Sequence, residues 1–263
     1  MNTPLNLFIG AAPRSGTTQL VEALQAHPDV TITPESRFIQ HFFSRGFPPD
    51  ILLDAEQGAL LESLMRADLK LSQWPNFELS PWLASQAPFE GRSISDVIGQ
   101  LFLDYAQATG SGTRVLGDKR NLYTVGLGPY TREVFPQSRF IFMVRNPYDV
   151  LRSHEDLSDR ALEPICHDLV YRYGNMKEMA NRFPHAVRIQ RYEELIDEPE
   201  QTLLELIRFL NLTPSDASLA ALNEAVEAAK AEGSPPELSP DNERLVESIT
   251  TPILDEQGYP TCD

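Results

Sequence analysis

The sequence has few cysteines and no long apolar run. Its two cysteines, Cys166 and Cys262, lie far apart, so they predict neither a disulfide framework nor a metal site. We therefore expect a reducing compartment and a cytoplasmic protein without a metal. No stretch approaches the roughly 20 apolar residues that a membrane span needs. Because the first predicted strand begins within a few residues of Met1, we also expect no signal peptide and no integral membrane association.

Basic residues are scarce as well. The chain has 22 lysines and arginines against 38 acidic residues, a formal net charge of −16 at pH 7. This excess argues against nucleic acid or an anionic polysaccharide as a bulk partner. Cations that fall within motifs are therefore more informative than they would be in a basic protein. The sequence carries no signal for the oligomeric state.

Short apolar runs alternate with helical patterns along the chain. A length of 263 residues with 41% hydrophobic residues fits one domain with a substantial core, which we take as residues 1–263. The alternation predicts an α/β protein, with a central parallel sheet of about five strands flanked by helices. The predicted strands are 5–11, 30–33, 113–117, 139–144 and 186–190. The predicted helices are about 17–26, 129–135, 147–158, 163–183, 199–211, 215–231 and 243–256.

Residues 38–110 interrupt this alternation with aromatic residues, prolines and weaker helical patterns. We interpret the segment as a helical insertion that covers the site and shapes an acceptor pocket. Its two tryptophans, Trp74 and Trp82, are predicted to pack in the interior rather than to serve as substrate platforms.

Residues 7–18, LFIGAAPRSGTT, join the first predicted strand to the first predicted helix. A glycine- and hydroxyl-rich loop at this place cradles anions with its backbone N–H groups and the helix dipole. Five residues separate Gly10 from Gly16, one more than in the nucleoside-triphosphate pattern, and Thr17 stands where that pattern has lysine. The loop's cation is Arg14, so the anion is not predicted to be ATP or GTP. The alternative is that these residues serve only turn geometry and capping.

Other polar residues follow the remaining strands. Glu35 comes after the second strand, Lys119 after the third, and Arg145 after the fourth, with Ser153 about two helical turns further on. The carboxyl ends of parallel strands meet at one edge of a sheet, where ligands bind. We therefore expect the loops at 12–18, 34–37, 117–120 and 145–147 to lie together.

Three segments, LFIGAAPRSGTTQL, FIFMVRNPYDVLRS and VRIQRYEELIDEP, resemble in order and content the sulfotransferases that use 3′-phosphoadenosine-5′-phosphosulfate (PAPS). ESR after HPDVTITP, and GDK, look most like the tyrosylprotein sulfotransferases and their bacterial relatives. The resemblance implies the P-loop, nucleotide-kinase-like sulfotransferase fold. It also implies sulfuryl transfer from PAPS to a hydroxyl, less often an amine, leaving 3′-phosphoadenosine-5′-phosphate (PAP) and needing no metal.

The resemblance also implies which residues hold the donor. The 5′-phosphosulfate loop corresponds to Arg14, Ser15, Gly16, Thr17 and Thr18. Arg145 and Ser153 correspond to the residues that hold the 3′-phosphate, and Tyr192 to a tyrosine near the adenine. Two alternatives stay open: Arg145 pairs only with a carboxylate, and Tyr192 is a core residue.

For the transfer step, the family match makes Glu35 the general base, which takes the acceptor's proton. Lys119 and Arg14 would stabilise charge in the transition state. Pairing of Glu35 with a neighbouring arginine such as Arg37 is the structural alternative. Arg37 and His41 are predicted to contact the acceptor, and His41 is the second candidate for the base because cytosolic sulfotransferases use histidine.

Two departures from the family pattern weaken the prediction of tight PAPS binding. The C-terminal cofactor segment, AEGSPPELSPDNERL, is turn-rich and acidic apart from flanking Lys230 and from Arg244, and Leu157 stands where the tyrosylprotein enzymes carry arginine. The alternatives are a non-catalytic PAP-binding protein and a P-loop kinase for a small molecule. The sequence leaves the acceptor open among small molecules, lipids, sugars and peptides.

Overall fold

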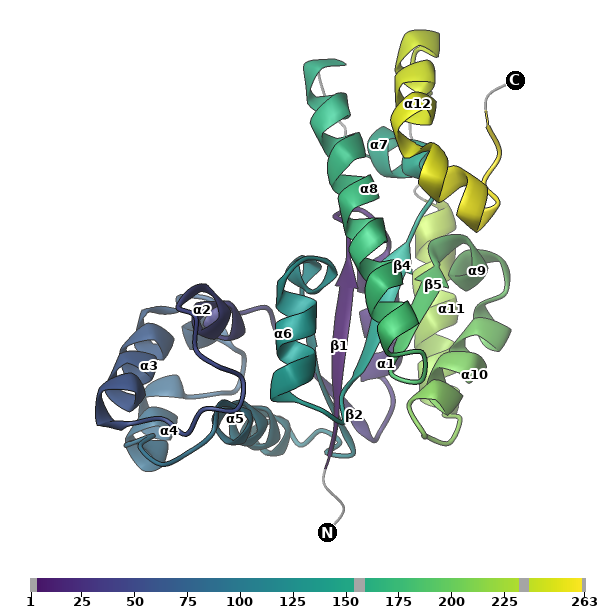
Figure 1. Ribbon diagram of the computed structural model, residues 1–263. Helices are drawn as coiled ribbons and strands as arrows, with labels where there is room; N and C mark the ends of the chain where they lie inside the picture. The colour runs from purple at the N-terminus through teal and green to yellow at the C-terminus, as the bar shows by residue number, and fades with distance from the viewer. Residues whose placement is uncertain (1–3, 154–158, 232–236, 262–263) are drawn as a thin grey trace.

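Five parallel strands form a single sheet in the order β2–β3–β1–β4–β5 (Figure 1). The computed structural model describes residues 4–153, 159–231 and 237–261. The predicted α/β class is confirmed, and four strands lie within one residue of their predicted bounds. The strands are β1 (Leu5–Ala11), β2 (Val30–Thr33), β3 (Val115–Lys119), β4 (Arg139–Val144) and β5 (Val187–Arg191).

Strand β3 begins and ends two residues later than predicted, and its last two residues are the polar Asp118 and Lys119 of GDK. Glycine and aspartate are depleted in strands, so the sequence pattern predicts that the strand ends at residue 117. In the structure Asp118 is fully buried, and it accepts hydrogen bonds from the hydroxyls of Tyr123 (2.5 Å) and Thr33 (3.4 Å). Burial raises the pKa of Asp118 despite the nearby Arg120 guanidinium. The longer strand carries Lys119 to the carboxyl edge of the sheet.

Helices cover both faces of the sheet (Figure 1). Along β1, Leu7 and Ile9 point to the face that is packed by α1 (Thr17–Gln25), α10 (Pro199–Phe209) and α11 (Asp216–Ala231). Phe8 points to the opposite face, packed by α6 (Leu127–Val134) and α8 (Asp159–Arg182). A third cluster joins α7 (Pro147–Arg152), part of α8 and α12 (Pro240–Gln257). The short helix α9 (Tyr192–Asp197), directly after β5, was not predicted.

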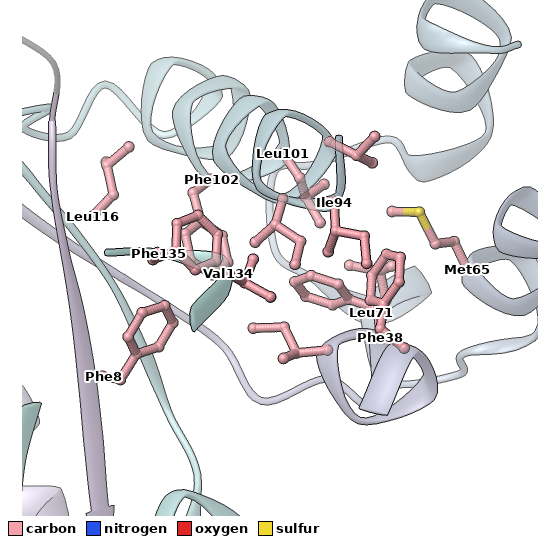
Figure 2. Packing of buried hydrophobic residues seen from close by; sticks show 14 of the residues in the cluster. Phe8, Phe38, Met65, Leu71, Ile94, Leu101, Phe102, Leu116, Val134 and Phe135 are labelled. Atoms are coloured by element: carbon pink, nitrogen blue, oxygen red, sulfur yellow. The ribbon is translucent and has the colours of Figure 1, made fainter. Parts of the chain in front are cut away.

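The segment 38–110 is largely helical, and most of its large hydrophobic side chains are buried in the cluster that covers one face of the sheet. Phe38 and Phe102 lie in the same cluster as Phe8 of β1 (Figure 2). Trp74 and Trp82 are both buried, which confirms the packing prediction. The helices are α2 (Phe38–Ser44), α3 (Ala55–Ala67), the 3-10 helix η1 (Leu71–Gln73), α4 (Leu79–Gln86) and α5 (Ile94–Ala108).

Several predictions fall partly on positions that are not described. The predicted helix 147–158 is observed to residue 152, and residues 154–158, with Leu157, lie outside the described residues, as do 232–236 of the turn-rich segment and Cys262. Within the described ranges, none of the helices is long and apolar enough to cross a bilayer. The described part of the chain also has no group of three or more metal-ligating side chains.

Candidate active site

The loop between β1 and α1 turns sharply at two positions. Arg14 has φ +68° and Gly16 has φ +80°, both in the left-handed region. A non-glycine residue there costs about 1–3 kcal/mol and is held by its surroundings. The Arg145 guanidinium supplies part of that support, because its Nη1 donates to the Arg14 carbonyl at 3.1 Å. The loop therefore curves around the N-terminus of α1. No capping side chain accepts a hydrogen bond from the first backbone N–H groups of that helix.

Gly16 is in close contact with an aromatic ring. A Cβ added at this position would lie 2.0 Å from Cδ2 of Tyr192, the first residue of α9. The same ring also contacts the Arg145 guanidinium, whose Cζ lies 4.4 Å from the ring centroid. Gly16, Tyr192 and Arg145 thus form a stack that joins the loop to the ends of β4 and β5.

We expect Gly16→Ala to disrupt this stack, because alanine meets both a left-handed backbone and the Tyr192 ring. The free energy of unfolding should fall by about 1–3 kcal/mol, which thermal denaturation would record as a loss of several degrees. Gly174→Ala is the matched control, because Gly174 is a helical glycine of α8 with open space around its Cβ position. That substitution should stabilise the protein slightly. Equal effects of the two would contradict the stack.

Predicted donor-binding residues meet on one side of the loop. Ser153 follows α7, and its Oγ accepts a hydrogen bond from Arg14 Nε at 3.3 Å and donates to Val150 O at 2.7 Å. Arg145 lies over Tyr192, and its Nε is buried without a hydrogen-bond partner among the described residues. Neither observation supports pairing of Arg145 with a carboxylate. The structure thus brings together Arg14, Gly16, Arg145, Ser153 and Tyr192.

Glu35 lies on the opposite side of the loop and pairs with two lysines. Its Oε1 is 3.0 Å from Lys119 Nζ, and its Oε2 is 2.9 Å from Lys70 Nζ. Partial burial acts to raise the pKa of Glu35, but hydrogen bonds and charges from Lys70 and Lys119 outweigh it and lower the pKa to about 2. The predicted alternative of a pair with Arg37 is not observed, since the partners of Glu35 are lysines.

A cavity of about 340 Å³ joins Glu35 to the anion loop. Thr17, Thr18, Glu35 and Lys119 lie in its wall, so the predicted base and the loop face the same space. Ser15 of the same loop is buried and is not part of this lining. The other walls come from α1, β2 and the helical segment, namely Val21, Gln25, Ile32, Thr33, Pro34, Pro75 and Tyr105.

The two predicted acceptor-binding residues do not belong to the described lining of this cavity. Neither Arg37 nor His41 is among the described residues that line it. The Arg37 side chain is exposed, and its backbone N–H donates to Asp68 Oδ2 at 2.5 Å. His41, on α2, is half-buried, and burial is the main reason that its pKa is lowered. The charges of Arg120, Arg45 and Arg37 also lower this pKa, whereas the charge of Asp68 acts to raise it.

Sequence reasoning did not find Lys70. It lies in the 38–110 segment, 35 positions from its partner Glu35, and nothing in its local pattern distinguishes it from a solvated lysine. The only available signal was the scarcity of basic residues in an acidic chain. Asp68, whose carboxylate accepts hydrogen bonds from the backbone N–H groups of Arg37 and Lys70, was missed for the same reason.

Fold and site together define an α/β protein with a sharply turned glycine-containing loop and a carboxylate–lysine pair at the carboxyl edge of a parallel sheet. A protein-family model described as the Sulfotransferase family matches residues 4–216. The chain therefore belongs to the sulfotransferase family, as the sequence motifs predicted.

Individual relatives agree with this assignment. The chain is 26% identical over 228 residues to the protein-tyrosine sulfotransferase of Drosophila melanogaster, covering 81% of this chain and 39% of that protein. It is 24% identical over 249 residues to nodulation protein NoeE of Sinorhizobium fredii, covering 84% and 53%. The chain thus spans about half or less of the length of these relatives.

Solved structures share the fold. The sulfotransferase domain of the Synechococcus PCC 7002 olefin synthase aligns with a TM-score of 0.60 at 21% identity, covering 94% of this chain and 95% of that one. Mouse sulfotransferase SULT7A1, complexed with PAP, aligns with a TM-score of 0.52 at 13% identity, covering 98% and 86%. At these identities the likeness establishes the fold alone.

Proposed function

We propose that this protein transfers the sulfuryl group of PAPS to a hydroxyl group of an acceptor. One observation carries the proposal: Glu35 and Lys119 share a cavity with Thr17 and Thr18 of the anion loop. A base beside a lysine, facing an anion-binding loop, provides both the proton acceptor and the charge neutralisation that group transfer needs.

The residues on the donor side fit the two anionic ends of PAPS. The buried Nε of Arg145 has no hydrogen-bond partner among the described residues, and an orphaned guanidinium N–H suits a phosphate oxygen. Ser153 and Arg14 supply further donors next to it. PAP is the ligand of the mouse sulfotransferase that shares this fold. Arg145 and Ser153 would hold the 3′-phosphate, with Tyr192 beside the adenine.

In the proposed reaction, Glu35 takes the proton of the acceptor hydroxyl while that oxygen attacks sulfur. The bond between sulfur and the bridging phosphate oxygen breaks, and the electron pair stays on the phosphate. Arg14 and Lys119 balance the charge that gathers on the bridging oxygen and the sulfuryl group. A carboxylate with a pKa of about 2 is ionised but weakly basic. When Lys119 turns toward the sulfuryl group, Glu35 loses a cation and becomes a better base.

The acceptor side of the cavity is mainly apolar, with Val21, Ile32, Pro34 and Pro75 in its wall. This lining suits a hydroxyl on an aromatic or aliphatic body, in a small molecule, a lipid, a sugar derivative or a peptide. A non-catalytic PAP-binding protein is the second candidate, and retention of Glu35 with Lys119 argues against it. The cytoplasmic location and the exclusion of nucleic acid stay predictions from the sequence.

A mass-spectrometric screen tests the proposal. The protein is incubated with PAPS and a cell extract, and the products are searched for compounds that gain one sulfonate. We expect such compounds with PAPS and none when ATP replaces it. If the protein binds PAP in calorimetry but modifies nothing, the non-catalytic candidate is correct. Turnover that depends on ATP and not on PAPS would establish a kinase.

A further inference from the structure

The two carboxylate oxygens of Glu35 have different partners. Lys119, the last residue of β3, reaches Oε1 at 3.0 Å, and Lys70, in the turn before η1, reaches Oε2 at 2.9 Å. The lysines also differ in their surroundings. The Lys119 side chain is 23% exposed and lines the cavity with Thr17 and Thr18, whereas the Lys70 side chain is 50% exposed and is not part of that lining. Only Lys119 therefore faces the space of the transferring group.

A buried carboxylate holds the backbone on both sides of the Lys70–Glu35 pair. Asp68 is 4% exposed and accepts three backbone hydrogen bonds, from Arg37 (2.5 Å), Lys70 (3.1 Å) and Leu71 (3.2 Å). Arg37 lies two residues after Glu35. Hydrogen bonds from N–H groups to an ionised carboxylate are stronger than neutral ones. Asp68 therefore ties the segment that carries the base to the turn that carries Lys70.

We propose that Lys70 is a positioning residue for the base. It anchors Oε2 of Glu35, so that Oε1 is the oxygen that takes the acceptor's proton once Lys119 has turned to the sulfuryl group. Asp68 supports this arrangement by fixing the Lys70 backbone. The inference rests on the proposed function, because it assigns the two oxygens of Glu35 separate tasks in the same transfer step.

The Lys70–Glu35 ion pair contributes little to folding stability. Both side chains are about half exposed, and ion pairs of that exposure contribute little to stability. Their electrostatic effect falls instead on Glu35, which faces Lys70, Lys119 and, within β3, Asp118. Removal of one cation raises the pKa of a carboxylate. Loss of Lys70 should therefore move the pKa of Glu35 upward from about 2 toward its ordinary value of 4.5.

The test compares Lys70→Met, Lys70→Arg and a matched control, Lys177→Met. Lys177 pairs with Glu256 between α8 and α12, with exposure similar to that of the Lys70 pair and away from the cavity. The first measurement is a ¹³C NMR titration of the Glu35 carboxyl, assigned with Glu35→Gln. It needs neither donor nor acceptor. The second is release of PAP from PAPS, with N-acetyltyrosine amide or water as acceptor.

We expect Lys70→Met to raise the Glu35 titration midpoint and lower kcat about 10- to 100-fold, since small displacements of a reacting group have effects of this size. The acid limb of the pH–rate profile should move to higher pH. The KM for PAPS and the affinity for PAP should change less than about threefold, since Lys70 lies outside the donor side. Lys70→Arg should restore most of kcat, and Lys177→Met should match the wild type.

An unchanged Glu35 titration or an unchanged kcat in Lys70→Met overturns the inference. So does a loss of kcat that Lys70→Arg fails to restore. If the wild-type protein neither binds PAP nor releases it from PAPS, the proposed function fails instead, and the NMR titration still decides whether Lys70 governs Glu35.

Discussion

Glu35→Gln should lower kcat for sulfuryl transfer by about 10²- to 10⁴-fold, the range that a positioned general base contributes. Glutamine keeps the shape of the side chain but cannot accept the acceptor's proton. Glu35 lines the cavity on the far side of the loop from Arg145 and Ser153. The dissociation constant of PAP should therefore stay within about threefold of the wild-type value. Single-turnover kinetics with PAPS and calorimetry with PAP measure the two effects separately.

His41→Ala distinguishes the two candidate bases. His41 does not line the cavity among the described residues, so we expect its replacement to cost less than about tenfold in kcat. Glu62→Gln is a control for the loss of a carboxylate outside the cavity lining, since Glu62 pairs with Arg66 on α3. If Glu35→Gln retains full transfer and His41→Ala does not, the base is the histidine.

Arg145→Met should weaken PAP binding by about 10- to 100-fold. Hydrogen bonds to charged groups contribute about 1.5–3 kcal/mol, and each 1.4 kcal/mol corresponds to about a factor of ten. The buried Nε of Arg145 is the orphaned donor that we assign to the 3′-phosphate. The loss should therefore be large for PAP and under about threefold for adenosine 5′-phosphate, which lacks that group. Calorimetric titration of both nucleotides measures the difference.

The comparison of PAP with adenosine 5′-phosphate also distinguishes the loss of a 3′-phosphate contact from general damage to the loop. Arg145 supports the loop through the Arg14 carbonyl and packs on Tyr192, so a collapsed loop would weaken both nucleotides alike. Equal losses for PAP and adenosine 5′-phosphate would therefore contradict a 3′-phosphate role. Thermal denaturation of the variant reports any structural damage independently.

The positions of the residues around the loop at 12–18 were largely predictable, because they follow from local sequence and one rule of topology. The anion loop is contiguous, and its arginine and glycine are visible as letters. Arg145 and Tyr192 directly follow the fourth and fifth strands, and parallel strands bring their carboxyl ends to one edge. The shift of β3 is the local exception. Its GDK residues form a strand because Asp118 finds hydroxyl partners in Thr33 and Tyr123, which no pattern within the strand reveals.

The acceptor side was less predictable because its contacts are distant in sequence and lie on irregular turns. Glu35 was predicted, but its partner Lys70 was not, and neither was the anchor Asp68. Such positions have no periodicity, since they depend on how the segment 38–110 packs against the sheet. The expected acceptor contacts of Arg37 and His41 were transferred from relatives, and the cavity lining does not include them.

The packing of the helical segment has a consequence for selectivity. Phe38, Phe102 and Trp74 share one apolar cluster with Phe8 and Phe140 of the sheet, so the segment is braced against the strands rather than attached by a hinge. If the segment shapes the acceptor site as proposed, the acceptor meets a preformed wall and not a closing cover. Of the residues that line the cavity, this segment supplies Pro75 and Tyr105, so substitutions at these two positions can change which acceptor fits while the loop at 12–18 is left unchanged.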